Sequence, residues 1–463
     1  MRGISLLSIA VVIIAASFSH AQQATPTMEW ARSLPAFSAA GDTKIIPLQS
    51  DLGYAIAGSC SAAAYGGSND LIFLVKTDLQ GRTTSGMHVY NTFVKKAPGT
   101  QEVKAVLQLI NGDIVLVGTR KFGMPNSQNT NVWIARINAS GSQRWLRVFG
   151  GVDGDAYKAQ CAIIMKTGDI CVGGQKGLNG WVGCVGQDGE TKWSNTYDGE
   201  KVMAFSRILT SHWGGVTAVC ISNSAEPRIV YFDRIDWDGM FQSSGYYGNA
   251  LQCQKMFGID PVIFTTGNSE ILSSEMNPCN GLCQVTLYGS DATFQWEHDF
   301  SMTCSGNETV TAISTLGDQS CVIAGTRMLA QDGGSSQMWM TGLCTCGKVT
   351  WTLTIPTDQT PYDIVPAGDH EFIVLSKGPF PKSNFTLTKY SAETKPLSSQ
   401  VSLSPSIRQN ATIPGANSGA QVYDVQGRRL SGLNTGRHSI GAYVFHCEPE
   451  SRTGEALLRI VQK

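Results

Sequence analysis

The stretch Asn131–Trp145 reads NVWIARINASGSQRW, a strand-like run followed by a polar glycine turn and a tryptophan. Two later stretches resemble it: GWVGCVGQDGETKW, which ends at Trp193, and QMWMTGLCTCGKVTW, which ends at Trp351. The residues that follow the turns recur about every 50 positions, and this period in an all-strand sequence predicts a propeller or another repeat array. These marker residues are Trp145, Trp193, Phe241, Trp296 and Trp351, and Trp30 and the region of His88 fit the same role upstream.

Each repeat carries signals for four strands. A short turn joins the first two strands, as in INGD (Ile110–Asp113), KTGD (Lys166–Asp169) and LGDQ (Leu316–Gln319). The second strand then ends in a glycine, at Gly118, Gly174 and Gly325. The third strand often contains a tryptophan, at Trp133, Trp181 and Trp339, and a glycine turn leads to the fourth. Four antiparallel strands per repeat are typical of the blade of a β-propeller.

The sequence therefore predicts an all-β fold, a β-propeller of about seven blades with six or eight as alternatives. Measured from the markers, the blades run near residues 28–87, 88–144, 145–192, 193–240, 241–295, 296–350 and 351–398. Because a propeller has no open edge, the isolated strand Thr27–Leu34 is a candidate to complete the last sheet. The tryptophan after each turn is interpreted as a packing residue between blades rather than a residue that stacks on a ligand.

The N-terminus predicts export. Residues 1–21 combine Arg2, an apolar run and small residues before Ala21, which is the pattern of a cleaved signal peptide. A membrane anchor is the alternative, but the apolar run is shorter than the ~20 residues that a spanning helix needs. No membrane span is expected after cleavage, and the protein is predicted to be extracellular or on the cell surface. A net charge of −1 argues against a nucleic-acid partner.

The thirteen cysteines form an odd number for an exported protein. We expect them mainly as buried small residues in strands, although pairs such as Cys279 with Cys283, or Cys344 with Cys346, remain open. Neither pair lies near a second Cys or His pair at zinc-like spacing. The segment Gly150–Lys158 lacks the donor set of a calcium loop. No metal and no cofactor are predicted.

The composition changes after Ser398. Residues 22–398 are assigned to the propeller, residues 399–420 to a linker rich in Ser, Asn, Pro and Gly, and residues 421–463 to a small C-terminal β-domain, expected to be a β-sandwich. This tail contains the motif residues Val422, Tyr423, Asp424, Gly427, Arg428, Gly441 and Tyr443. It resembles the C-terminal sorting domain of proteins exported by type IX secretion. That resemblance implies that the secretion machinery recognises the tail, whereas a β-sandwich appendage with no sorting role is the alternative.

The propeller repeats also resemble those of secreted bacterial propellers. Gly347–Trp351 is the best match to the glycine turn and tryptophan of pyrroloquinoline-quinone-type repeats. No catalytic motif accompanies the repeats: a G-x-S-x-G elbow, an H-E-x-x-H helix and a P-loop are all absent from the sequence. The run Glu297-His298-Asp299 cannot form a local triad, because neighbouring side chains of a strand point to opposite faces. No catalytic residues are predicted.

A positional set of polar residues is the candidate site. Each lies in a segment that leads from one blade to the inner strand of the next, and such segments gather around the mouth of a propeller's channel. The set comprises Asp42, Glu102, Asp155, Glu200, Asn249, Glu308 and Asp358. As a mildly acidic rim it would bind a cation, a sugar or a peptide; the alternative is that these side chains satisfy backbone N–H groups.

The sequence thus favours a non-enzymatic module that binds a glycan or a protein. An exported enzyme on the same scaffold is the alternative, either a quinone-dependent oxidoreductase or a polysaccharide-cleaving enzyme, since a propeller supports all of these activities. A polysaccharide-cleaving enzyme would need paired carboxylates about 5 to 9 Å apart. The sequence does not identify such a pair.

Overall fold

The structure of the protein is a computed structural model. It covers residues 25–34, 39–49, 52–61, 70–90, 99–122, 129–150, 156–197, 204–210, 214–221, 228–250, 262–265, 271–277, 282–288, 294–301, 308–316, 320–328, 336–344, 348–378, 384–392, 443–448 and 457–462. The chain divides into two compact units, Met1–Pro396 and Leu397–Lys463, which are described separately. Residues 1–21, predicted to be a signal peptide, lie outside the described residues.

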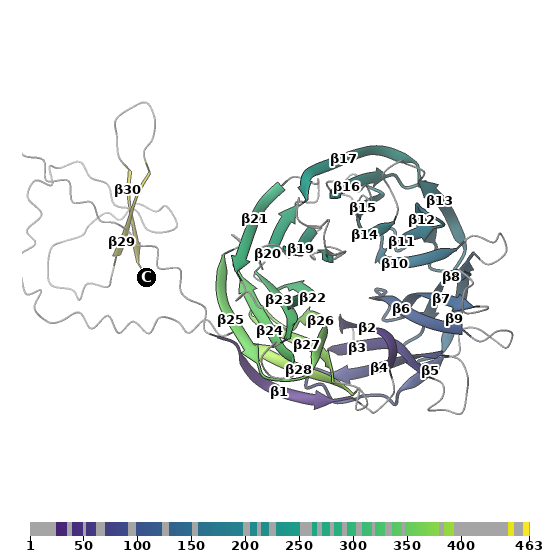
Figure 1. Ribbon diagram of the computed structural model, residues 1–463, viewed down its shortest axis with the longest axis horizontal. Helices are drawn as coiled ribbons and strands as arrows, with labels where there is room; N and C mark the ends of the chain where they lie inside the picture. The colour runs from purple at the N-terminus through teal and green to yellow at the C-terminus, as the bar shows by residue number, and fades with distance from the viewer. Residues whose placement is uncertain are drawn as a thin grey trace, which may run out of the picture. The chain divides into compact units, whose positions relative to one another are not determined.

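The larger unit is a β-propeller. Its described residues form seven four-stranded antiparallel sheets that follow one another around a centre. The strands β2, β6, β10, β14, β22 and β26 lie nearest that centre, whereas β1 lies on the outer edge (Figure 1). The first three sheets in chain order are β2–β5, β6–β9 and β10–β13. They contain β2 (Ala39–Leu48), β3 (Gly53–Ser61), β4 (Asp70–Asp78), β5 (His88–Tyr90), β6 (Gly99–Gln108), β7 (Ile114–Phe122), β8 (Thr130–Ile137), β9 (Gln143–Phe149), β10 (Tyr157–Ile164), β11 (Ile170–Lys176), β12 (Asn179–Val185) and β13 (Thr191–Tyr197).

The next three sheets are β14–β17, β18–β21 and β22–β25. They contain β14 (Phe205–Thr210), β15 (Val216–Ile221), β16 (Arg228–Ile235), β17 (Phe241–Ala250), β18 (Val262–Thr265), β19 (Ile271–Asn277), β20 (Leu282–Tyr288), β21 (Phe294–Ser301), β22 (Glu308–Thr315), β23 (Cys321–Met328), β24 (Ser336–Leu343) and β25 (Val349–Ile355). The blade ranges expected from the sequence were therefore wrong by one strand. Each marker aromatic belongs to the last strand of a sheet, so counting from it assigned that strand to the following blade.

The last sheet closes the ring with a strand from the N-terminus. It joins β26 (Thr360–Pro366), β27 (Glu371–Lys377) and β28 (Phe385–Ser391) to β1 (Thr27–Ser33), which pairs antiparallel with β28. The Lys389 ammonium lies 2.9 Å from Glu29 and 2.8 Å from Glu371, so an ion triad spans β1, β28 and β27. The prediction that Thr27–Leu34 completes the last sheet is confirmed.

The marker aromatics join one sheet to the next. The ring of Trp145 in β9 lies against Gly189 in the turn after β12, and its indole N–H donates to Gln187 O at 2.8 Å. Trp193 in β13 lies against Gly239 in the same way and donates to Trp237 O at 2.7 Å. Gly189 and Gly239 have φ near +87° and +79°, which glycine adopts without steric strain. The prediction that these tryptophans are packing residues is confirmed.

The upstream markers occupy the same position. Trp30 in β1 lies against Gly81, and the His88 ring in β5 lies against Gly141. The tryptophans of the third strands are different, because Trp133, Trp181 and Trp339 are completely buried between sheets. Aromatic side chains thus pack both the edges and the faces of the sheets, and this accounts for the repeat seen in the sequence.

The described part of the smaller unit is a two-stranded hairpin of β29 (Tyr443–Glu448) and β30 (Leu457–Gln462). Tyr443 is the first residue of β29, and the other six sorting-motif residues lie outside the described residues. Within the described portion of the chain, no helix is long and apolar enough to cross a membrane. Six of the described cysteine side chains are buried, namely those of Cys60, Cys161, Cys171, Cys184, Cys220 and Cys321. Cys344 is half-buried and disulfide-bonded.

Candidate functional site

The inner strands carry a shared irregularity that shapes the channel. The pairing of the first two strands shifts by one residue at Val103/Ala105, Ala159/Cys161, Phe205/Arg207, Val310/Ala312 and Pro361/Asp363. Each shift follows a residue that pairs with the interior of the second strand, for example Val103 with Gly118. The second strands predicted to end at Gly118, Gly174 and Gly325 continue to Phe122, Lys176 and Met328, so those predicted ends were too early. A β-bulge redirects the side chains beside it. Because these bulges lie at equivalent positions of the inner strands, they determine which side chains point into the channel at that height.

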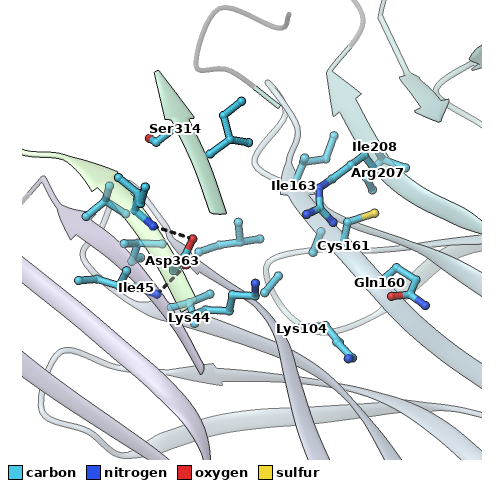
Figure 2. A pocket seen from close by; sticks show the side chains of 18 residues that line it. Lys44, Ile45, Lys104, Gln160, Cys161, Ile163, Arg207, Ile208, Ser314 and Asp363 are labelled. Atoms are coloured by element: carbon cyan, nitrogen blue, oxygen red, sulfur yellow. Dashed lines mark hydrogen bonds between the residues drawn. The ribbon is translucent and has the colours of Figure 1, made fainter. Parts of the chain in front are cut away.

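A cavity of about 460 Å³ lies at this level, inside the ring. Its volume is in the range of small-ligand sites. The wall comes from β2, β6, β10, β14, β22 and β26, and its polar side chains are Lys44, Lys104, Gln160, Arg207, Ser314 and Asp363 (Figure 2). Ile45, Ile163 and Ile208 are among the apolar residues of the same wall. The described wall therefore combines apolar surface with a few converging charged groups.

Equivalent positions of the inner strands differ in chemistry. In the sheet register Lys44 of β2, Cys161 of β10, Arg207 of β14 and Asp363 of β26 pair with interior residues of the second strand, namely Ala57, Gly173, Val219 and Leu375. The same level therefore presents two cations, a thiol and a carboxylate. Among the described lining residues three side chains are cationic and Asp363 is the single carboxylate. Because Lys104 is paired with Glu102 at 3.0 Å, the excess positive charge rests on Lys44 and Arg207.

The Asp363 carboxylate is fixed at the place where the ring closes. It accepts a hydrogen bond from the backbone N–H of Ile45 in β2 at 3.2 Å, and one from the backbone N–H of Ile364 at 3.2 Å. Burial raises the pKa of Asp363, and the nearby Lys44 charge, the two backbone donors and Arg207 oppose that rise. The side chain is only partly exposed, and its exposed part borders the cavity.

Arg207 lies across the cavity on β14, beside Cys161 (Figure 2). One of its terminal nitrogens donates to Ser206 O at 2.9 Å. Burial lowers the pKa of Arg207, whereas Cys161 and Asp363 raise it. Because the guanidinium of an arginine stays protonated in proteins, Arg207 supplies a fixed positive charge with planar donors, the geometry that suits a carboxylate or sulfate group. Burial raises the pKa of Cys161 to about 12, so this thiol is neutral.

The structure describes the side chains of only two residues of the acidic rim predicted from the sequence, Glu102 and Asp358. Glu102 is in β6 and pairs with the Lys104 ammonium at 3.0 Å, and Asp358 is exposed in the segment between β25 and β26. Asp42, Asn249 and Glu308 lie in β2, β17 and β22, where only their backbone is described. Asp155 and Glu200 lie outside the described residues. None of the seven belongs to the described wall of the cavity, so the rim stays a prediction.

Sequence reasoning missed the cavity residues, although a signal for them exists. Several inner strands contain a charged residue directly before an apolar pair, as in Lys44-Ile-Ile, Arg207-Ile-Leu and Asp363-Ile-Val. A charge inside an otherwise apolar strand is rarely buried without a role or a partner. No group of three or more His, Cys, Asp or Glu that would hold a metal occurs among the described residues.

Comparison with known proteins yields structures alone. No protein-family model matches the chain, and no curated protein matches it. One similar structure is a member of the DUF4221 family from Bacteroides vulgatus, with a TM-score of 0.37 and 9% identity, covering 80% of this chain and 98% of that one. Another is the NanB sialidase from Streptococcus pneumoniae, with a TM-score of 0.40 and 10% identity, covering 78% of this chain and 70% of that one. At these scores neither structure carries an argument about function.

Proposed function

We propose that this protein is an exported binding module whose channel cavity takes an acidic group of a glycan. The observation that carries the proposal is the charge of the described wall, where Lys44, Lys104 and Arg207 face one carboxylate, Asp363. A desolvated cation attracts an anion more strongly than it does in water, since the effective dielectric constant is lower. A cavity of about 460 Å³ suits a sugar residue better than the broad surface of a protein partner.

The apolar part of the wall supports the same ligand class. Ile45, Ile163 and Ile208 offer surface for the C–H face of a sugar ring, while Gln160 and Ser314 offer hydrogen bonds to its hydroxyl groups. A few polar groups on an apolar wall are the usual composition of a small-ligand site.

The test is a glycan-binding measurement on the full mature chain. We expect glycans that carry a carboxylate or sulfate to bind and their neutral counterparts to bind at least tenfold more weakly. Arg207→Gln and Lys44→Gln should each weaken binding of the acidic glycan about tenfold, because each removes one cation from the wall. Arg82→Gln is the matched control, since Arg82 is an exposed cation outside the cavity.

Three outcomes would overturn the proposal. Equal binding of acidic and neutral glycans would remove the role of charge. Capture of a protein and no glycan would replace the ligand class. Release of a shortened or oxidised product would make the protein an enzyme, and the polysaccharide-cleaving or quinone-dependent alternative would then take its place.

We also propose that the C-terminal unit directs export. The support is the sequence pattern around Val422, Tyr423 and Gly427, together with the signal peptide expected in residues 1–21. In the native host, a chain that ends at Pro396 should accumulate in the periplasm while the full chain reaches the surface or the medium. Equal surface exposure of both chains would contradict a sorting role.

A further inference from the structure

Two cysteines lie opposite each other on neighbouring strands of the sheet β10–β13. Cys171 in β11 and Cys184 in β12 are direct partners in the antiparallel register. The Cys171 thiol donates to Cys184 Sγ, and the two sulfur atoms are 2.7 Å apart. Both residues are buried, with exposed fractions of 0% and 3%. The two thiols are therefore in direct contact in a region that is closed to solvent.

The same apolar cluster contains two further cysteines that make no such contact. Cys161 and Cys220 belong to the cluster around Cys171 and Cys184. The Cys161 Sγ lies 3.7 Å from Gly173 O and 4.0 Å from Phe205 O, so its thiol is directed to backbone carbonyls. All four cysteines are thus buried in one core. Only Cys171 and Cys184, among these four, are direct partners in the strand register.

We propose that Cys171 and Cys184 form a disulfide within this blade in the exported protein. Directly opposed residues of an antiparallel pair have Cα atoms about 4.5–5.5 Å apart, inside the range of about 4.4–6.8 Å that a disulfide spans. The backbone is therefore already in place. The proposal rests on the proposed export, because disulfides persist in oxidising compartments.

The reaction is thiol–disulfide exchange with a disulfide oxidant of the export compartment. One cysteine thiolate attacks a sulfur of the oxidant and forms a mixed disulfide, and one oxidant thiolate leaves. The second cysteine thiolate then attacks the first cysteine's sulfur and expels the other oxidant thiolate. Two electrons pass to the oxidant, and the protons of the two cysteines end on its two thiols.

The burial of the pair fixes when the bond forms. The hydrogen bond with Cys184 and then burial raise the pKa of Cys171, so the folded dithiol holds little of the reactive thiolate. Oxidation therefore precedes packing of this sheet against its neighbour. After the sheet has packed, burial also protects the disulfide from reductants, since both cysteines are almost completely inaccessible to solvent.

Tryptic mapping of the exported full-length protein tests the bond. Trypsin cleaves after Lys166, Lys176 and Lys192, so Cys171 and Cys184 fall in the separate peptides 167–176 and 177–192. After alkylation without reductant, mass spectrometry should find these peptides joined, with a mass lower by two hydrogens than their sum. Cys161→Ser and Cys220→Ser should keep the joined peptide, whereas Cys171→Ser and Cys184→Ser should abolish it.

A second measurement tests the disulfide independently of the proposed export. Protein refolded in a glutathione redox buffer should give the same joined peptide, and reductant present during refolding should lower Tm by an amount on the order of 5 °C. The Cys171→Ser/Cys184→Ser double variant should show no such reductant effect. Recovery of both peptides in alkylated form from the exported and from the refolded protein would overturn the proposal. Acidic-glycan binding by the double variant reports on the cavity independently.

Discussion

The periphery of the propeller repeats, whereas its channel does not. At four described junctions an aromatic ring of one sheet lies against the turn glycine of the next, in the pairs Trp30/Gly81, His88/Gly141, Trp145/Gly189 and Trp193/Gly239. At one level of the channel, the equivalent inner-strand residues are instead Lys44, Ala105, Cys161, Arg207, Ala312 and Asp363. The residue types are therefore nearly the same at the outer edges of the four described junctions. They differ from sheet to sheet at the centre.

The difference follows from what each position must do. The blades of a propeller are repeated units, so one packing solution recurs at the four described junctions with the same residue types. A ligand in the proposed cavity would touch several sheets at once, and each sheet would then supply a different group. Repetition in the sequence thus reports on packing, and the proposed binding site lies where the repetition is broken.

The largest effect is expected from a tryptophan buried between the faces of two sheets. Trp181 is completely buried, lies edge-on to Phe149 and Tyr157 at centroid distances of 5.1 and 5.4 Å, and donates to Ser194 Oγ at 2.9 Å. Trp181→Ala should lower the free energy of unfolding by about 3–5 kcal/mol, because it leaves a large cavity between two sheets. Urea unfolding followed by circular dichroism measures this change.

The matched control is Trp237→Ala. Trp237 is 46% exposed in the turn before β17, and its role as acceptor for Trp193 uses the backbone carbonyl, which alanine retains. A loss of stability as large as that of Trp181→Ala would show that burial between sheets is not what makes the third-strand tryptophan important.

A smaller effect is expected at the repeated turn aspartates. Asp113 is almost completely buried, and one of its oxygens lies 2.7 Å from Arg136 and 2.8 Å from Arg144. Arg136 also donates to Gln187 O of the next sheet at 2.6 Å, so the pair connects two blades. Asp113→Asn should lower the free energy of unfolding by about 2–4 kcal/mol, because it leaves Arg136 partly buried without its counter-charge.

Asp169 provides the comparison for this prediction. It occupies the same turn position in the next repeat but pairs with Lys192, whose side chain is 52% exposed, at 2.9 Å. Asp169→Asn should shift Tm by about 1 °C or less, since exposed pairs contribute little. Equal shifts for the two variants would contradict the assignment of the Asp113 cluster to inter-blade stability.

The sequence predicted the periphery well because its signal is local. The turn glycine and the marker aromatic of each unit lie a few residues apart, as Gly141 and Trp145 do, and His88 was placed correctly although it is not a tryptophan. Closure by Thr27–Leu34 followed from the need to remove an open edge. The predicted order of the strands within a repeat was right, but the predicted blade boundaries were wrong. The repeat length alone does not show which strand of the repeat begins a blade.

The channel was not predicted because its signal is distributed. Lys44, Arg207 and Asp363 lie on three different sheets, and only closure of the ring places Asp363 beside Ile45. The bulges that set the level of these side chains depend on strand pairing and carry no fixed residue type, since the positions inside them include Lys104, Gln160 and Ser206. Spacing along the chain therefore could not assemble the cavity.

A moderate effect of opposite sign is expected from Asp363→Asn. Removing the single described carboxylate of the wall should tighten binding of an acidic glycan about three- to tenfold, because it removes a repulsive charge. The asparagine oxygen can still accept from the Ile45 N–H. Isothermal titration with a sulfated glycan measures the change, and weaker binding by the variant would mean that Asp363 contacts the ligand directly.

A further test compares how stability and glycan affinity depend on pH in the wild type and in Asp363→Asn. The folded pKa of Asp363 is raised above its ordinary value of 3.8 by burial, so folded protein retains a proton that unfolded protein has lost. This residue's contribution to stability therefore falls as the pH rises from about 3.8 through the folded pKa. Relative to the wild type, Asp363→Asn should gain stability over that interval, and its affinity for a sulfated glycan should lose the rise that the wild type shows on acidification.

The smallest effect distinguishes the predicted rim from the cavity. If Glu102 acts through Lys104, which lies 3.0 Å away, then Glu102→Gln removes a charge that competes with an acidic ligand and should tighten binding about two- to threefold. If Glu102 instead accepts hydrogen bonds from a ligand at the rim, the same substitution weakens binding. Tm should be unchanged in either case, because both side chains are partly exposed. The direction of the change thus decides whether the channel wall or the acidic rim holds the ligand.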